Sequence, residues 1–100
     1  MKTFVDLHIL DYIYILDKQS GSIDRIKIVD KVYSISNTVI FTFSDFSQLW
    51  FAQDKSITVD GNLIYIADQL LLIPELEKLI KHSKAVIKSA TKNIKLLKEI

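Results

Sequence analysis

The apolar residues of this 100-residue chain change their period once, at Asp68, and that change defines the class of fold. Over residues 3–67, apolar and polar residues alternate in short runs separated by turn-forming residues, a pattern typical of β-strands. Residues 68–72 are predicted to form a turn capped by Asp68. Over residues 74–98, apolar residues recur every three or four positions, as in an amphipathic helix. We therefore predict a single α+β domain (residues 1–100), an antiparallel β-meander followed by one long C-terminal amphipathic α-helix.

Two long alternating runs, residues 4–16 and 23–36, predict the first hairpin. Gly21 lies between them, where its freedom to adopt a positive φ suits a turn. Asp11 and Asp30 each interrupt the apolar face of their run, so we expect a β-bulge that turns each acid outward. These two aspartates are not expected to be cross-strand neighbours, because facing carboxylates repel each other.

The middle of the chain predicts shorter strands. Residues 38–43 alternate clearly, whereas residues 48–52 fit either a strand or a helical turn. Residues 56–59 and 63–66 flank an Asp-Gly-Asn sequence, and Asp-Gly between two β runs is the strongest hairpin signal in the chain. The total is about five or six strands, enough for a small barrel or roll. On element order alone, the chain resembles pleckstrin-homology-like and other small-barrel binding modules.

The predicted helix over residues 74–98 is too long for a small sheet to cover. About 25 helical residues span about 37 Å, whereas an ordinary strand spans about 17–20 Å. Large apolar side chains left exposed in the last turns would each cost about 1.5–3 kcal/mol. A second copy of the chain is the nearest source of cover, so we predict a homodimer. The predicted partner-binding residues are Ile87, Ile94, Leu97, Ile100 and, outside the helix, Trp50.

Positive charge is concentrated in the same helix. Residues 74–100 hold seven lysines and three glutamates, a net charge of +4, whereas residues 1–73 hold six basic and nine acidic side chains, a net charge of −3. A row of lysines on a rigid helix suits phosphates, so nucleic-acid binding is the alternative function. The helix has no arginine and no aromatic residue among its lysines, which favours a solvated face instead. The lysines of this alternative are Lys81, Lys84, Lys88, Lys92 and Lys95.

Trp50 is the single tryptophan of the chain and lies in its densest aromatic cluster, with Phe46, Leu49 and Phe51. Tryptophan is enriched at the hot spots of protein interfaces. In a small domain, a lone tryptophan also commonly covers the edge of the core. For Trp50 the sequence favours the second interpretation, a cover for the core, over the first.

The residues that several classes of function need are missing from the sequence. The chain contains no cysteine, which removes disulfides, thiolate nucleophiles and cysteine-bound zinc. His8 and His82 are isolated, the aspartates follow no metal-binding spacing, and no glycine-rich phosphate loop or hydrolase motif occurs. We therefore predict no catalytic, cofactor-binding or metal-binding residue and no enzymatic activity.

Hydropathy and composition suggest where such a chain works. The longest uncharged stretch, residues 32–44, is shorter than the roughly 20 apolar residues that a membrane span needs. Asp6 lies where a signal peptide needs apolar residues, so we expect a cytoplasmic protein. Abundant isoleucine and lysine is typical of AT-rich genomes, such as those of many bacteria and their phages. We predict a non-enzymatic interaction or assembly module, a viral or bacterial accessory protein that self-associates through its C-terminal helix.

Overall fold

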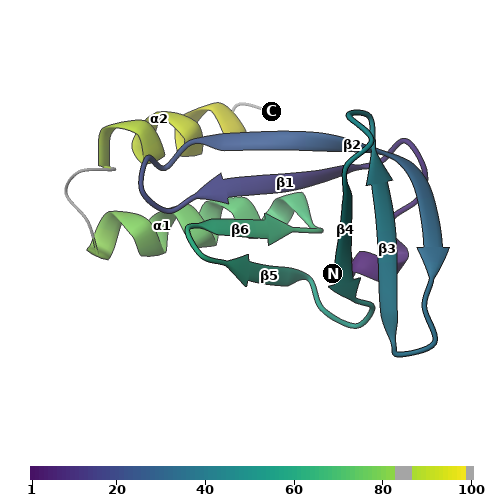
Figure 1. Cartoon of the computed structure of the whole chain (residues 1–100). Coiled ribbons are helices and arrows are strands. Elements are labelled where there is room, and N and C mark those ends of the chain that lie inside the picture. The colour runs from purple at the N-terminus through teal and green to yellow at the C-terminus, as the bar shows by residue number, and fades with distance from the viewer. Residues whose placement is uncertain (83–86, 99–100) are drawn as a thin grey trace.

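A computed structural model describes the backbone of residues 1–82 and 87–98 and the side chains of residues 1–79 and 93–98. It contains six strands in one antiparallel sheet and two α-helices, so the α+β class is confirmed (Figure 1). The strands are β1 (Tyr12–Asp17), β2 (Ile23–Tyr33), β3 (Thr38–Phe43), β4 (Gln48–Ala52), β5 (Ile57–Asp60) and β6 (Leu63–Ile66). The helical elements are η1 (Phe4–Asp6), η2 (Gln69–Leu71), α1 (Leu72–His82) and α2 (Ile87–Lys98), of which η1 and η2 are short 3-10 helices.

The sheet has the strand order β4-β3-β2-β1-β6-β5. Strands β1 to β4 form the predicted meander, and the β5–β6 hairpin then returns to pair β6 with the free edge of β1. Strands β3 and β4 cross the direction of β1 and β6, so the sheet curls until it is nearly barrel-shaped (Figure 1). Strand β1 is therefore central, while β4 and β5 are the two edges.

Local sequence signals placed the turns and the bulge correctly. Gly61 adopts a φ of +59° in the tight turn between β5 and β6, where Asp60 pairs with Leu63. The pairing of β2 with β3 shifts register between Ile28 and Asp30, and Asp30 is exposed. This confirms the bulge predicted at Asp30. Residues 48–52, left open between strand and helical turn, form β4.

The predicted long strand over residues 4–16 is wrong in its first half. The Asp6 carboxylate accepts hydrogen bonds from the N–H and the hydroxyl of Thr3, both at 2.9 Å, and so caps η1. The Asp11 carboxylate accepts the N–H of His8 at 2.8 Å. Aspartate side chains that bind nearby main chain compete with the ladder of a sheet. The strand therefore begins only at Tyr12, and Asp11 makes a turn rather than a bulge.

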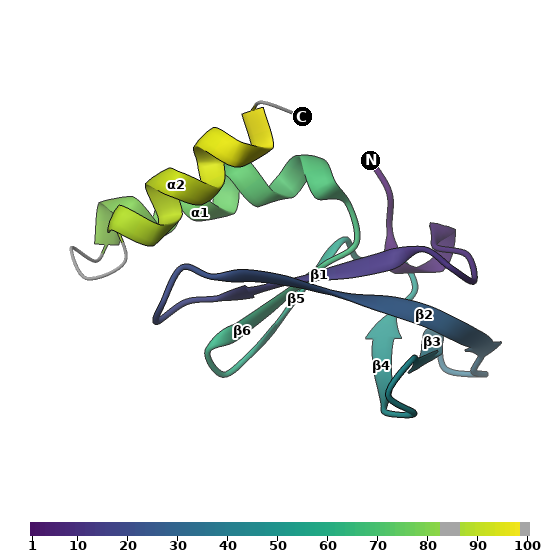
Figure 2. The same ribbon diagram turned by 90° about the horizontal axis from the view of Figure 1, so that it is seen from above.

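The prediction of one long C-terminal helix over residues 74–98 is also wrong. Helix α1 ends at His82, and α2, which begins at Ile87, packs against it on the same face of the sheet (Figure 2). The physical reason is the length mismatch noted above. Two short helices side by side bury more apolar surface against a small sheet than one long rod does. Asn93 in α2 donates to the carbonyl oxygen of Gly21 at 2.8 Å, which holds α2 over the β1–β2 turn.

Side chains from the two faces of the sheet form two separate cores. Alternation along β1 sends Ile13 to one core and Leu16 to the other. The aromatic core lies on the face away from the helices and comprises Phe4, Leu7, Ile13, Ile28, Val39, Phe41, Phe43, Phe51, Tyr65 and Ala67. The aliphatic core lies beneath the helices and comprises Leu16, Ile64, Ile66, Leu72 and Leu76.

Candidate functional site

Of the four helix residues predicted to bind a partner, the structure describes the side chains of two. Ile94 and Leu97 are partly buried and pack against the aliphatic core of their own chain. The Ile87 side chain and the whole of Ile100 lie outside the described residues. Ile94 and Leu97 are therefore covered in part by their own chain, so the length of the helical region does not by itself require a second copy.

The predicted lysine row is divided between two helices. Lys81 belongs to α1, whereas Lys88, Lys92 and Lys95 belong to α2, which packs against it. Lys84 lies outside the described residues, as do the side chains of Lys81, Lys88 and Lys92. Lys95 is exposed in the last turn of α2. The fold thus does not place these lysines in one straight row along a single helix. Nucleic-acid binding stays a hypothesis without new support.

Trp50 is not a cover for the core, because it lies on the outward face of β4 with 60% of its surface exposed. The cross-strand register places it beside Ile40, which in turn lies beside Val32, exposed by 51%. These three side chains form an apolar row across three strands, which we call the Trp50 row. An apolar row on the solvent face of a sheet is typical of a contact surface.

Phe46 is a further exposed apolar residue, at the turn that leads into β4. It is 88% exposed and has a φ of +67°, a backbone conformation that bulky residues rarely adopt. A phenylalanine at this position gains little from its own chain and strains its backbone. Both features fit a residue kept for an external contact.

The main chain of β4 has a free edge. Phe43 N–H donates to Ser47 at one end of the β3–β4 ladder, and Gln53 N–H donates to Asn37 at the other. Because hydrogen-bonded and non-hydrogen-bonded pairs alternate in an antiparallel ladder, Gln48 and Trp50 direct their N–H and C=O groups away from β3. No other main-chain bond engages these two residues in the described part of the chain.

This edge lacks the usual protection against pairing. Strand β4, Gln-Leu-Trp-Phe-Ala, contains no charge and no proline, the residues that proteins commonly place on edge strands. Within the described residues, the N-terminal segment forms main-chain hydrogen bonds with the residues after β4 rather than with β4 itself. There, the N–H groups of Phe4 and Val5 donate to the carbonyls of Lys55 and Gln53 at 2.8 and 3.2 Å.

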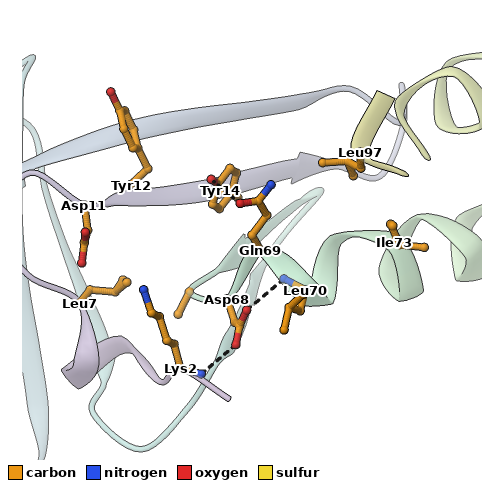
Figure 3. A pocket seen from close by; sticks show the side chains of 11 residues that line it. Lys2, Leu7, Asp11, Tyr12, Tyr14, Asp68, Gln69, Leu70, Ile73 and Leu97 are labelled. Carbon is orange, nitrogen blue, oxygen red and sulfur yellow. Dashed lines mark hydrogen bonds between the residues drawn. The ribbon is translucent and has the colours of Figure 1, made fainter. Parts of the chain in front are cut away.

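A cleft of about 640 Å³ lies on the helix side of the sheet, among the N-terminal segment, β1, η2 and both helices (Figure 3). Its volume falls within the range of small-molecule sites, roughly 300–1,000 Å³. Lys2, Asp11 and Asp68 lie toward one end, together with Leu7, and Ile73 and Leu97 lie at the other (Figure 3). The lining residues are Lys2, Leu7, Asp11, Tyr12, Tyr14, Ala67, Asp68, Gln69, Leu70, Ile73 and Leu97.

Asp68 joins the sheet to the helices beside this cleft. Its carboxylate accepts the N–H of Lys2 at 2.8 Å and the N–H of Leu70 at 3.0 Å, so it caps η2 as predicted. These two main-chain donors hold the pKa of Asp68 below its usual value. The carboxylate is therefore ionised at neutral pH, with both oxygens already occupied.

The described residues add two observations on function. Within them, no three histidine or acidic side chains come together in a way that could hold a metal ion. No helix in the described part is both long and apolar enough to cross a membrane.

Comparison with protein-family models, with curated proteins and with solved structures found no match to this chain. The proposals below therefore depend on the site geometry alone. Sequence analysis singled out Trp50 but missed the free edge of β4, which depends on strand order. It also missed the cleft, whose lining comes from residues as distant as Lys2 and Leu97. No local pattern could have indicated either.

Proposed function

We propose that this chain is a protein-interaction module that self-associates by pairing β4 with β4 of a second copy. The observation that carries the proposal is the free main-chain edge at Gln48 and Trp50, next to the exposed Trp50 row. Edge strands without charge or proline are templates for pairing with another chain. A second copy supplies the same donors and acceptors in the same spacing.

Two-fold symmetry selects a register for this pairing. An antiparallel pair with its axis at Leu49 sets Gln48 of one copy opposite Trp50 of the other. Both residues then exchange main-chain hydrogen bonds, and every group used is one that β3 leaves free. The register also spares Ala52, whose carbonyl oxygen already accepts the N–H of Lys55 at 3.3 Å.

The same arrangement gives the exposed apolar residues a partner. Pairing two β4 strands joins two sheets into one, so the two Trp50 rows lie on one continuous face. Each indole then lies over the neighbouring strand near Gln48 of the partner. Tryptophan in such a central position is commonly a hot spot of binding.

Proline at position 48 tests the proposal by removing one edge donor. Gln48→Pro removes an N–H that β3 does not use, and proline is tolerated on edge strands. We expect the wild-type chain to sediment as a dimer in the micromolar range and Gln48→Pro to sediment as a monomer. Trp50→Thr keeps β propensity and should raise the dimer dissociation constant by about tenfold or more.

A matched control exists on the opposite edge of the sheet. The Ala67 N–H donates to Ser56, so the alternation leaves the N–H of Val59 in β5 facing outward, as for Gln48 in β4. Val59→Pro should therefore remain a dimer. A wild-type chain that is monomeric at every concentration tested, or a Gln48→Pro variant as dimeric as the parent, would contradict the proposal.

A further inference from the structure

The cleft on the helix side of the sheet shares no lining residue with the Trp50 row, and its chemistry does not depend on self-association. It is wide enough for a small molecule, at about 640 Å³. Its walls belong to the two α-helices, to β1 and to the N-terminal segment (Figure 3). The question is which chemical class of ligand its two ends would recognise.

At the polar end, one cation and one anion face each other without touching, beside the ionised Asp68 carboxylate. Figure 3 shows the Lys2 ammonium and the Asp11 carboxylate directed toward the same space. No ion pair joins Lys2 to Asp11 or to Asp68 within the described residues. Asp11 uses Oδ2 to accept the His8 N–H, and its other oxygen has no described partner. Both charges are therefore available to a ligand.

Asp68 lies nearby but has little capacity left for a ligand. Both of its oxygens already accept main-chain N–H groups, from Lys2 and from Leu70. The pair with free hydrogen-bonding capacity is thus Lys2 and Asp11, while the negative charge of Asp68 lies beside them. A ligand with only one charge would be attracted by one of them and repelled by the other.

The opposite end of the cleft is aliphatic. Ile73 of α1 and Leu97 of α2 lie there, both partly exposed, whereas Leu70 of η2 lies nearer the middle of the cleft, next to Asp68 (Figure 3). The Tyr14 side chain forms part of the wall between the two ends, where its hydroxyl lies 3.3 Å from Oε1 of Gln69. An apolar group along this wall, against Tyr14 and Leu70, would gain free energy by leaving water.

We propose that the cleft binds a small zwitterion with an apolar side chain, the chemical class of the apolar α-amino acids. The ligand carboxylate accepts hydrogen bonds from the Lys2 ammonium, and the ligand ammonium donates to the free oxygen of Asp11. The apolar side chain lies against Tyr14 and Leu70, the next lining residues along the cleft. Binding of this kind satisfies both unpaired charges at once, which neither an anion nor a cation alone can do.

Three probes of similar shape separate the charge requirements. L-phenylalanine carries both charges, 3-phenylpropionate only the negative one, and 2-phenylethylamine only the positive one. In NMR titrations of the labelled full chain, we expect L-phenylalanine to shift the amides of Asp11, Gln69 and Leu70. Each singly charged probe should bind about tenfold more weakly, because it leaves one protein charge unpaired.

Two variants assign the charges to residues. Lys2→Met keeps the main-chain N–H that holds Asp68, and Asp11→Asn keeps an acceptor for His8, so both should fold. Lys2→Met should weaken L-phenylalanine about tenfold and leave 2-phenylethylamine no weaker, whereas Asp11→Asn should weaken L-phenylalanine and leave 3-phenylpropionate no weaker. Lys55→Met and Asp54→Asn, which change exposed residues outside the cleft, should leave all three probes unaffected.

The results that would overturn the assignment are distinct. Equal affinity for 3-phenylpropionate and L-phenylalanine would show an anion site, and equal affinity for 2-phenylethylamine would show a cation site. No shift of the cleft amides up to the solubility limit of L-phenylalanine would show no site of this class. None of these outcomes depends on whether β4 pairs with a second copy.

Discussion

The two cores of the molecule are built from different chemistry, although one sheet separates them. In the aromatic core, the ring of Phe51 stacks on Phe4 with centroids 4.2 Å apart, and it also lies 6.0 Å from Phe41 and 5.6 Å from Tyr65. The buried members of the aliphatic core are leucines and isoleucines from β1, β6 and α1. Rings fix a few contacts of defined geometry, whereas aliphatic side chains repack more easily.

The difference shows how each face of the sheet is closed. The N-terminal segment, residues 1–11, closes the aromatic core. Apart from η1 it has no regular secondary structure, and its buried side chains are those of Phe4 and Leu7. Two amphipathic helices close the aliphatic core. The aromatic side needs specific anchors for a segment that has little helical or strand structure of its own, while the helical side relies on periodic packing.

The largest expected effect comes from removing the centre of the aromatic core. Phe51→Ala should lower the free energy of unfolding by about 3–5 kcal/mol, and Leu76→Ala in the aliphatic core by about 2–4 kcal/mol, as measured by urea denaturation. Because β1 contributes Ile13 to one core and Leu16 to the other, each variant should still unfold in one transition. Near-ultraviolet circular dichroism reports on the aromatic core and far-ultraviolet circular dichroism on the helices. Two separate transitions in these two signals would show that the cores unfold independently.

An intermediate effect is expected at the anchor of the N-terminal segment. The Lys31 ammonium donates to the carbonyl oxygens of Val5 and Leu7, each at 2.6 Å, and so holds the segment over the aromatic core. Lys31→Met should cost about 1–2 kcal/mol and speed amide exchange in residues 4–7. Lys27→Met, in the same strand, serves as the control and should change stability by about 0.5 kcal/mol or less. Equal losses in the two variants would refute the anchoring role.

The smallest effect is expected at Asp68, where the two halves of the fold meet. Asp68→Asn keeps one acceptor but loses the other, and should cost about 1 kcal/mol at neutral pH. Since main-chain donors lower the pKa of Asp68, its contribution is complete above the usual pKa of about 3.9 and disappears as the pH falls through the lower folded value. The stability difference between wild type and variant should therefore be constant from neutral pH to about pH 5 and shrink below about pH 4. A difference that is the same at acid and neutral pH would mean that the charge of Asp68 does not matter.

Much of the sheet followed from local sequence signals. The turn at Gly61, the bulge at Asp30 and the alternation over residues 38–43 each depend on a few neighbouring residues, and all are present. The same local view failed at Asp6 and Asp11. There, alternation continued in the sequence, but the carboxylates bound their own main chain and ended the strand pattern.

The rest depended on how distant segments meet. A single helix over residues 74–98 would indeed be longer than the sheet. In the fold, α2 packs against α1 instead, so both helices lie over the sheet. Periodicity cannot show this, because an apolar stripe continues with the same spacing through both helices. The edge position of β4 and the placing of Lys2 and Asp11 around one cleft likewise depend on how distant segments pack.

The central position of β1 also has a consequence for synthesis on the ribosome. Strand β1 pairs with β2 soon after it emerges, but its other side must wait for β6, whose residues 63–66 are made much later. Throughout that interval the nascent meander has two unpaired strand edges, one on β1 and one on β4. Closing a loop of this span is entropically unfavourable and slow compared with forming a hairpin. Arrival of the β5–β6 hairpin is therefore the step that commits the chain to its final topology.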